Sequence, residues 1–290
     1  MVSGTTILQS LLSGVLDGGN YALYALGLAF VFGIMRVINL AHGELLVLGG
    51  YVAYWLQRIV GVDPLLALPA AALAPAGVAF AADRVFLRRI RTTEELNTLI
   101  LTFGVGIFLA NLYLQLWSAD LRSIDVPWMQ RPVAVGGIRF GVGEIVAFAV
   151  SLAGVLGLHL FVRRTRTGRA IRATAIDRDA ASLAGIDVER IDRLAFSLGG
   201  ALAGLGGPLL GVLSHLAPGT GIGVTVKGFM LTVLAGVGSI PGLVAGGIIL
   251  GVGEAMTATF VSSSVRELFG FALFLAILVV RPHGLFGRRT

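Results

Sequence analysis

The chain has no cysteine, which excludes disulfides, thiolate metal sites and cysteine nucleophiles. Charge is also scarce, since 13% of the 290 residues are charged against about 25% in soluble domains, while 56% are hydrophobic. The sequence GxxxxGK[ST] is absent and Lys227 is the one lysine, so a Walker A nucleotide site is excluded. Spacing suggests no Ser-His-Asp set, and basic residues are not interleaved with aromatic ones. We therefore expect an integral membrane protein with no catalytic residues and no nucleic-acid partner.

Apolar runs of about 20 residues, the length that a helix needs to cross a bilayer, recur along the chain. We expect an all-α, polytopic membrane helix bundle of about eight or nine spans with broken helices, forming one transmembrane domain over residues 1–290. The expected spans are residues 7–35, 45–60, 65–82, 96–117, 144–162 and 194–213, two segments within 227–256, and 266–280. Polar residues at 17–20 predict either an unwound point in the first span or a short entry segment before it.

Arginines gather at a few points between the spans. They are Arg84, Arg88, Arg89 and Arg91, those of residues 163–193, and Arg281, Arg288 and Arg289. Because basic loops stay on the cytoplasmic side, we assign these segments to the cytoplasm. The polar stretches 119–143 and 214–225 then lie outside, the first as an ordered loop. This arrangement requires a turn within residues 236–242 that splits the last long apolar run.

Residues 163–193 hold 13 of the chain's 38 charged residues, eight of them arginine. Charged side chains are costly at the bilayer centre, so this segment lies at a membrane face. Ala173, Ala180 and Ala184 recur at helical spacing and Gly185 follows them. We interpret the segment as a short helix with a small-residue face that docks a cytoplasmic partner. The alternative is an ordinary positive-inside loop.

Residues 39–44, NLAHGE, interrupt the apolar sequence with three polar side chains, and residues 236–242, GVGSIPG, interrupt the second half. Paired interruptions predict a permeation pathway in transporters. Exposed N–H groups at a helix start favour carboxylates and other anions. The alternative is a membrane-boundary turn with Asn39 as N-cap and Glu44 in the first helical turn. His42 and Glu44 provide too few ligands for zinc, so no metal site is expected.

Two acidic residues, Asp17 and Glu254, stand inside apolar stretches. Ionisable residues at such positions usually face a cavity or the interior of a bundle. A position at the membrane edge is the alternative for both.

Three stretches together resemble the permease subunits of bacterial ABC importers for branched-chain amino acids, the LivH type. They are GGNYALYALGLAFVFGIMRVINLAHGELLVLGGYVA, TRTGRAIRATAIDRDAASLAGI and FMLTVLAGVGSIPGLVAGGIILGVGE, at residues 18–53, 165–186 and 229–254. The resemblance covers most of the chain in the same order. It implies a bacterial cell membrane location, a second homologous, LivM-like permease subunit, two ABC ATPase subunits and an extracytoplasmic binding protein. ATP is then bound by the ATPase partners, and no cofactor is expected in this chain.

In ABC permeases, a cytoplasmic loop with the pattern EAA-x-x-x-G docks in a groove of the ATPase and moves as a rigid lever. Residues 179–185, DAASLAG, match this pattern with Asp179 in place of glutamate, although no I-x-L-P follows. The resemblance therefore assigns 163–193 as the coupling loop. The residues expected to couple the loop to the ATPase are Thr167, Gly168, Arg169, Arg172, Ala173, Asp179, Ala180, Ala181 and Gly185. Those expected along the solute pathway are Asn39, His42, Gly43, Glu44, Gly238, Ser239, Pro241 and Gly242.

Other functions remain open at this point. Urea or short amides are substrates within the same family resemblance. A secondary transporter or channel without an ATPase needs membrane-embedded carboxylates, for which Asp17, Glu44 and Glu254 are the candidates. A membrane enzyme is the third class, and no catalytic set supports it.

Overall fold

Long helices make up most of the part of the chain that the computed structural model describes, residues 4–90 and 95–287. The predicted Arg91, Arg288 and Arg289 lie outside these residues. The longer helices are α1 (Gly4–Met35), α2 (His42–Val60), α3 (Pro64–Ala82), α5 (Glu95–Trp117), α6 (Val142–Arg164), α9 (Val188–Leu213), α10 (Thr220–Ala235), α11 (Ile240–Phe260) and α12 (Arg266–Val280). The shorter elements are a π-helical turn (Asp83–Leu87), α4 (Arg88–Ile90), α7 (Arg166–Ile176), α8 (Arg178–Leu183), a 3-10 turn (Ser263–Val265), β1 (Pro132–Val135) and β2 (Ile138–Gly141).

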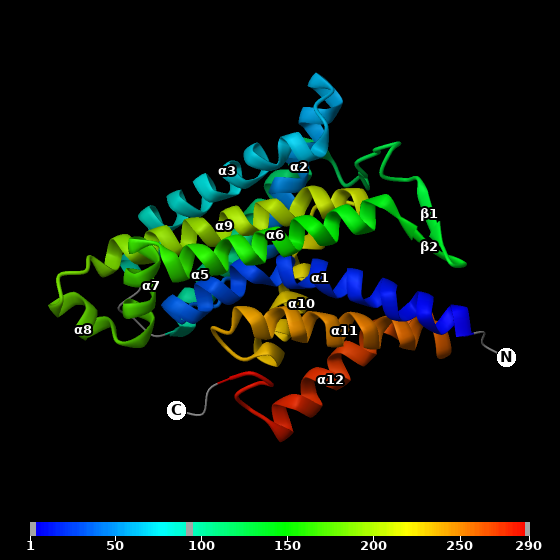
Figure 1. The fold of residues 1–290 in the computed structure, drawn as a ribbon. Helices are drawn as coiled ribbons and strands as arrows, with labels where there is room; N and C mark the ends of the chain where they lie inside the picture. The colour runs from blue at the N-terminus through cyan, green and yellow to red at the C-terminus, as the bar shows by residue number, and fades with distance from the viewer. Residues whose placement is uncertain (1–3, 91–94, 288–290) are drawn as a thin grey trace.

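The predicted all-α membrane bundle is confirmed. Within the described residues, seven helices are long and apolar enough to cross a membrane, and they start at residues 4, 64, 96, 142, 188, 240 and 263. The helices α2 and α10 complete the bundle, at 19 and 16 residues. Helices α7 and α8 lie at one end, whereas β1, β2 and the N-terminus lie at the other (Figure 1). We call these the α7–α8 end and the hairpin end.

The first helix is continuous, so the predicted interruption at residues 17–20 is wrong. Asp17 and Asn20 lie within α1, and the glycines that suggested a break mediate a helix contact instead. A Cβ at Gly18 would stand 2.7 Å from the carbonyl carbon of Gly247 in α11, and one at Gly14 would stand 2.8 Å from the carbonyl oxygen of Gly251. Small residues allow this approach, which matters in lipid because hydrophobicity does not drive helices together there.

The predicted turn within residues 236–242 is present. Helix α10 ends at Ala235, and Gly236 and Gly238 follow with positive φ angles of 89° and 81°. The Ser239 hydroxyl then caps α11 by accepting a hydrogen bond from the backbone N–H of Gly242 at 3.1 Å. At the start of α10 the prediction was wrong, since the helix begins at Thr220 and includes part of the expected outer loop.

Residues 119–143 form an ordered connection, as predicted, and contain a hairpin. Strands β1 and β2 pair antiparallel, and the turn between them uses Gly136 and Gly137 at φ angles of 59° and 86°. Two glycines with positive φ are typical of the tight turns that suit the strand twist. The Gln9 side chain accepts a hydrogen bond from the backbone N–H of Arg139 at 2.8 Å, which fixes the hairpin to the start of α1.

Candidate functional site

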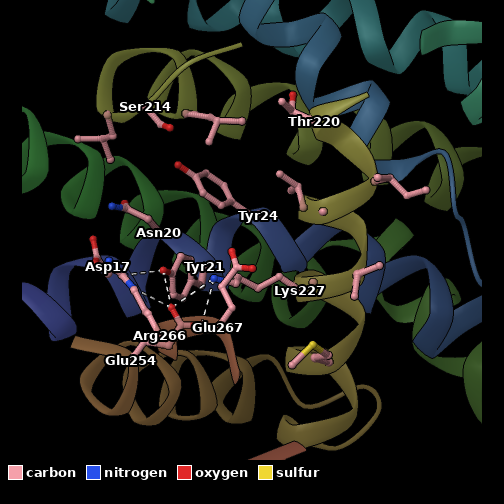
Figure 2. Close-up of a pocket in the computed structure, with 18 of the residues that line it drawn as sticks. Asp17, Asn20, Tyr21, Tyr24, Ser214, Thr220, Lys227, Glu254, Arg266 and Glu267 are labelled. Atoms are coloured by element: carbon pink, nitrogen blue, oxygen red, sulfur yellow. Dashed lines mark hydrogen bonds and ion pairs between the residues drawn. The ribbon is translucent and has the colours of Figure 1, made fainter. Parts of the chain in front are cut away.

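A cavity of about 650 Å³ lies among α1, α10, α11 and α12 and the connection between α9 and α10. Its wall contains Asp17, Asn20, Tyr21, Tyr24, Leu210, Leu213, Ser214, Thr220, Ile222, Gly223, Val224, Val226, Lys227, Gly228, Met230, Glu254, Arg266, Glu267 and Phe271. We call this space the charged cavity (Figure 2). Helix α9 starts at the α7–α8 end and crosses the bundle, so the α9–α10 connection places the cavity toward the hairpin end.

Ion pairs join the helices around the charged cavity. Arg266 Nη2 lies 2.6 Å from Asp17 Oδ2, and Arg266 Nε lies 3.2 Å from Glu254 Oε2. Lys227 Nζ lies 3.1 Å from Glu254 Oε1 and 4.5 Å from the centre of the Tyr21 ring. The Tyr21 hydroxyl accepts from Arg266 and donates to Glu254, both at 2.9 Å. We call Asp17, Lys227, Glu254 and Arg266 the tetrad.

The Glu254 side chain explains why two cations gather here. This residue is 0% exposed, and an isolated carboxylate at such a place would be strongly disfavoured. Lys227 and Arg266 compensate its charge from α10 and α12, and Asp17 in α1 compensates the second cation. The tetrad is therefore neutral as a unit and connects α1 with the three C-terminal helices α10, α11 and α12.

The prediction that Asp17 and Glu254 face a cavity is confirmed. Sequence reasoning missed Lys227, Arg266 and Tyr21, because it treated Lys227 and Arg266 as the ends of spans. The signal for Lys227 was available, since this single lysine stands in an apolar run that continues on both sides.

Residues 39–44 lie between α1 and α2 and are closely packed. The exposed fractions of Asn39, His42 and Glu44 are 2%, 0% and 4%. His42 Nε2 lies 2.7 Å from the carbonyl oxygen of Tyr24, and the backbone N–H of Gly43 donates to Thr225 Oγ1 at 2.8 Å. Within the described chain these side chains do not line the charged cavity. Their place along the solute pathway stays a prediction.

The non-helical backbone before α2 is satisfied by protein groups. The Thr102 hydroxyl accepts from the Leu40 N–H at 3.2 Å and donates to the Ile38 carbonyl at 3.0 Å. Irregular backbone at membrane depth requires such partners. The N-cap of α2 is Ala41, so the alternative of Asn39 as N-cap is wrong; Asn39 Oδ1 instead accepts from the Ala41 N–H at 3.1 Å within the preceding turn.

The second interruption lies elsewhere. Gly238 and Ser239 line a separate cavity of about 150 Å³ together with Ile171, Arg172 and Ala175 of α7, whereas Pro241 and Gly242 begin α11. Residues 39–44 contact the first turns of α10, and residues 236–239 follow its last turn. From Thr225 to Ala235, α10 rises by about 15 Å, so the two interruptions lie at different levels along this helix. The structure therefore joins the second interruption to the predicted coupling loop.

The coupling loop folds as two helices, so the single predicted helix is wrong. Asp177 ends α7 and its side chain caps α8 by accepting from the Ala180 N–H at 2.9 Å. The predicted small-residue face is divided between the two helices, since Ala173 is half-buried in α7 whereas Ala180 of α8 and Ala184 after it are exposed and Ala181 is buried; its packing against a partner stays a prediction. Gly185 follows α8 with a φ of 82°. Of the other predicted coupling residues, Gly168 is buried, Thr167 and Ala173 are half-buried, and Arg169, Arg172 and Asp179 are exposed.

An ion pair attaches the coupling loop to the bundle. Arg178 makes two hydrogen bonds to the carboxylate of Asp192 in α9, one of them at 3.2 Å, and Asp192 is 0% exposed. Arg178 also donates to the carbonyl of Ile34, near the end of α1, at 3.5 Å. On the outer surface Ile176 and Leu183 are 86% and 91% exposed. The loop is therefore fixed on one side and presents large apolar side chains on the other.

The fold and the charged cavity define a multi-pass helical membrane protein of the transport class. Residues 10–278 match the family described as "Branched-chain amino acid transport system / permease component". The chain belongs to this family, as its resemblance to LivH-type permeases indicated.

Several characterised proteins are similar along nearly the whole chain. The high-affinity branched-chain amino acid transport system permease protein LivH of Salmonella typhimurium is 36% identical over 97% of this chain and 96% of its own length. The corresponding protein BraD of Pseudomonas aeruginosa is 35% identical with the same coverage. The ribose import permease protein RbsC of Escherichia coli is 32% identical over 89% of this chain and 81% of its own length. Relatives with this architecture thus include permeases named for amino acids and for a sugar.

Proposed function

We propose that this chain is a permease subunit of an ATP-driven ABC importer for branched-chain or related amino acids in a bacterial inner membrane. Two permease subunits, this chain and a LivM-like homologue, form the pathway, and two ATPase subunits bind and hydrolyse ATP. An extracytoplasmic binding protein delivers the solute at the hairpin end. Membership of the permease family and the names of the amino-acid relatives support this proposal.

The main support for the ATP-driven part of this proposal is the exposed apolar pair, Ile176 and Leu183, on the coupling loop. Single exposed apolar side chains are common at protein surfaces, but these two flank α8, whose position is held by Arg178. Apolar anchors on a pre-organised element are typical of docking surfaces. We assign this surface to the ATPase.

The same loop provides a route for the movement. When an ATPase shifts α8, Arg178 transmits the movement to α9 through Asp192 and to the end of α1 through the Ile34 carbonyl. Helix α7 also borders the turn at Gly238 and Ser239, which follows the end of α10, and α10 carries Lys227 in the charged cavity. Rigid helices joined in this way can transmit a shift from the loop to the cavity, as alternating access requires.

Uptake in proteoliposomes tests the proposal. The complete complex is reconstituted with ATP inside the vesicles and loaded binding protein outside, on the assumption that the permease inserts with its coupling loop inward. We expect ATP-dependent leucine uptake, and no uptake by the permease alone under a leucine gradient. In the double variant Ile176→Ser/Leu183→Ser, both uptake and stimulation of the ATPase by the loaded binding protein should be lost, while membrane insertion is retained.

The matched control is Val280→Ser, which changes a 76% exposed valine at the end of α12, outside the coupling loop and away from the hairpin end. It should leave uptake and ATPase stimulation unchanged. Robust leucine uptake by the permease alone would favour a secondary transporter instead, and wild-type coupling in the Ile176/Leu183 double variant would refute the assigned docking surface.

A further inference from the structure

The charged cavity has one more negative than positive side chain. Its charged residues are Asp17, Glu254 and Glu267 against Lys227 and Arg266. The tetrad uses both cations, and Glu267 has no ion pair with any residue in 4–90 or 95–287. The view in Figure 2 places Glu267 beside Lys227, at the cavity. Glu267 is exposed, so water solvates its carboxylate, which remains available to pair with a ligand that carries a positive group.

Two largely buried residues, Tyr24 and Asn20, add hydrogen-bond donors to the wall. Tyr24 is 9% exposed, and its hydroxyl has no hydrogen-bond partner among the described side chains and backbone groups. Figure 2 shows its ring extending between Asn20 and Ser214. Asn20 is 3% exposed, and its Oδ1 accepts from Ser151 at 3.0 Å, which leaves the amide NH₂ without a partner in the part of the chain described. Neither donor atom is among the fully buried atoms of the described chain, so both reach the cavity, where a ligand or water can accept a hydrogen bond from them.

The rest of the wall is aliphatic, with Leu210, Leu213, Ile222 and Val226 on the α9 and α10 sides. The cavity thus offers an acceptor for a cation, donors for an anion and an apolar surface. Its volume of about 650 Å³ lies in the range of small-molecule sites.

We propose that the charged cavity is a binding site for an α-amino acid zwitterion within the permease itself. The ammonium group pairs with Glu267, the carboxylate accepts from Tyr24 and Asn20, and the aliphatic side chain lies against Leu213 and Val226. This assignment rests on the proposed function and specifies its substrate class. Urea and ribose can donate hydrogen bonds to the extra carboxylate but form no ion pair with it, so the site favours an α-amino acid over the neutral solutes that the sequence and the relatives leave open.

Cysteine protection tests this assignment, because the chain contains no cysteine of its own. Ser214→Cys places a thiol in the cavity wall, and Ser262→Cys places a control thiol on an exposed position after α11. The permease–ATPase complex, without binding protein, is labelled with a charged methanethiosulfonate reagent. Leucine should slow labelling at position 214 in proportion to occupancy, roughly fivefold at four times its Kd. Labelling at position 262 should not change.

Analogues and variants identify the groups involved. Ribose at the same concentration should give no protection at position 214, and N-acetylleucine, which lacks the ammonium group, should give much less than leucine. In the Ser214→Cys background, Glu267→Gln should abolish protection by leucine, whereas Glu267→Asp retains part of it and the distant control Glu189→Gln retains all of it. Equal protection by leucine and ribose, or full protection by leucine in Glu267→Gln, would refute the site.

Parallel uptake measurements separate this inference from the proposed function. If ATP drives leucine uptake but leucine gives no protection at position 214, the binding site is wrong and the proposed function stands. If leucine protects position 214 but ATP does not drive uptake, the binding site stands and the proposed function is wrong.

Discussion

Individual glycines decide how closely the helices of this bundle approach. At the start of α2, Gly43 faces Gly221 of α10 so closely that a Cβ at position 43 would overlap the carbonyl oxygen of Gly221. A Cβ at Gly221 would in turn lie 2.5 Å from the backbone nitrogen of Glu44. The contact is backbone to backbone, so rotation of a side chain cannot relieve it.

We therefore expect Gly43→Ala to force the two helices apart and to destabilise the protein by about 1–3 kcal/mol, the usual cost of overpacking. Gly77→Ala is the matched control, since Gly77 lies in α3 and a Cβ at this position would have nothing within 4 Å. Thermal unfolding in detergent should show a lower midpoint for the first variant alone. Equal midpoints would mean that the helices can separate freely at this contact.

Single residues also show how far sequence reasoning reaches. A carboxylate within an apolar run is improbable unless it faces a cavity, and this argument located Asp17 and Glu254 correctly. Their partners could not be found in this way, because Asp17 and Arg266 are 249 positions apart and only the packing of α1 against α11 and α12 brings them together. The glycines at 18 and 19 were interpreted as part of an interruption of the first span, and only the neighbouring helices α11 and α6 show that they serve close packing instead.

Among the elements, the coupling loop depends on one arginine. Arg178 in α8 is the contact that joins this short helix to α9 through Asp192 and to α1 through Ile34. Asp192 is fully buried, so removing Arg178 takes away a cation that helps to compensate its charge in these apolar surroundings.

Arg178→Ala should loosen the coupling loop and uncouple transport. We expect ATP-dependent uptake to fall by at least an order of magnitude and limited proteolysis to cleave faster within residues 163–193, with the seven apolar spans still inserted. Arg178→Lys should restore function only in part, because lysine cannot reproduce the two-point contact with a carboxylate. The matched control Arg190→Ala changes an exposed arginine of the same segment and should behave as wild type. Unaltered uptake and proteolysis in Arg178→Ala would show that the ion pair does not hold the loop.

The structure also changes which substitutions test the loop cleanly. From the sequence, a charge at Ala181 or a bulky residue at Gly185 would be expected to interfere with docking. Ala181 is 4% exposed and lies on the buried face of α8, so a charge there disrupts the loop itself. Gly185 has a φ of 82°, which strains any larger residue. The exposed Ile176 and Leu183 are the better positions because their replacement leaves the internal packing intact.

At the scale of the whole molecule, the number and order of the helices follow from hydrophobic length, which the sequence shows directly. Hydrophobic length alone does not predict how α2 and α10 cross in the bundle. Both helices are shorter than most spans and begin at polar or glycine-rich positions. Their starts are fixed by groups distant in sequence, such as Thr225 and Tyr24. The charged cavity exists only in this assembled arrangement, because four helices contribute to the tetrad.

A double-mutant cycle measures how strongly the tetrad ties these helices together. Lys227→Met removes a cation from α10, and Glu254→Gln removes the buried carboxylate from α11. Each single variant leaves a charge of the cluster without its compensation and should destabilise the protein. The loss of unfolding free energy in the double variant should be smaller than the sum of the two single losses, by about 1–3 kcal/mol. Thermal unfolding of the wild type, the two single variants and the double variant in detergent measures this coupling free energy.

The exposed pair Arg88 and Glu189 is the control for this cycle. Its atoms are 3.0 Å apart, but both side chains are more than half exposed, so water screens their attraction and its coupling should be close to zero. A coupling between Lys227 and Glu254 that is no larger than this surface value would mean that the tetrad does not hold α10 and α11 together. In that case the charges at the cavity would be available to a ligand at little structural cost, and the neutral tetrad would no longer be a fixed part of its wall.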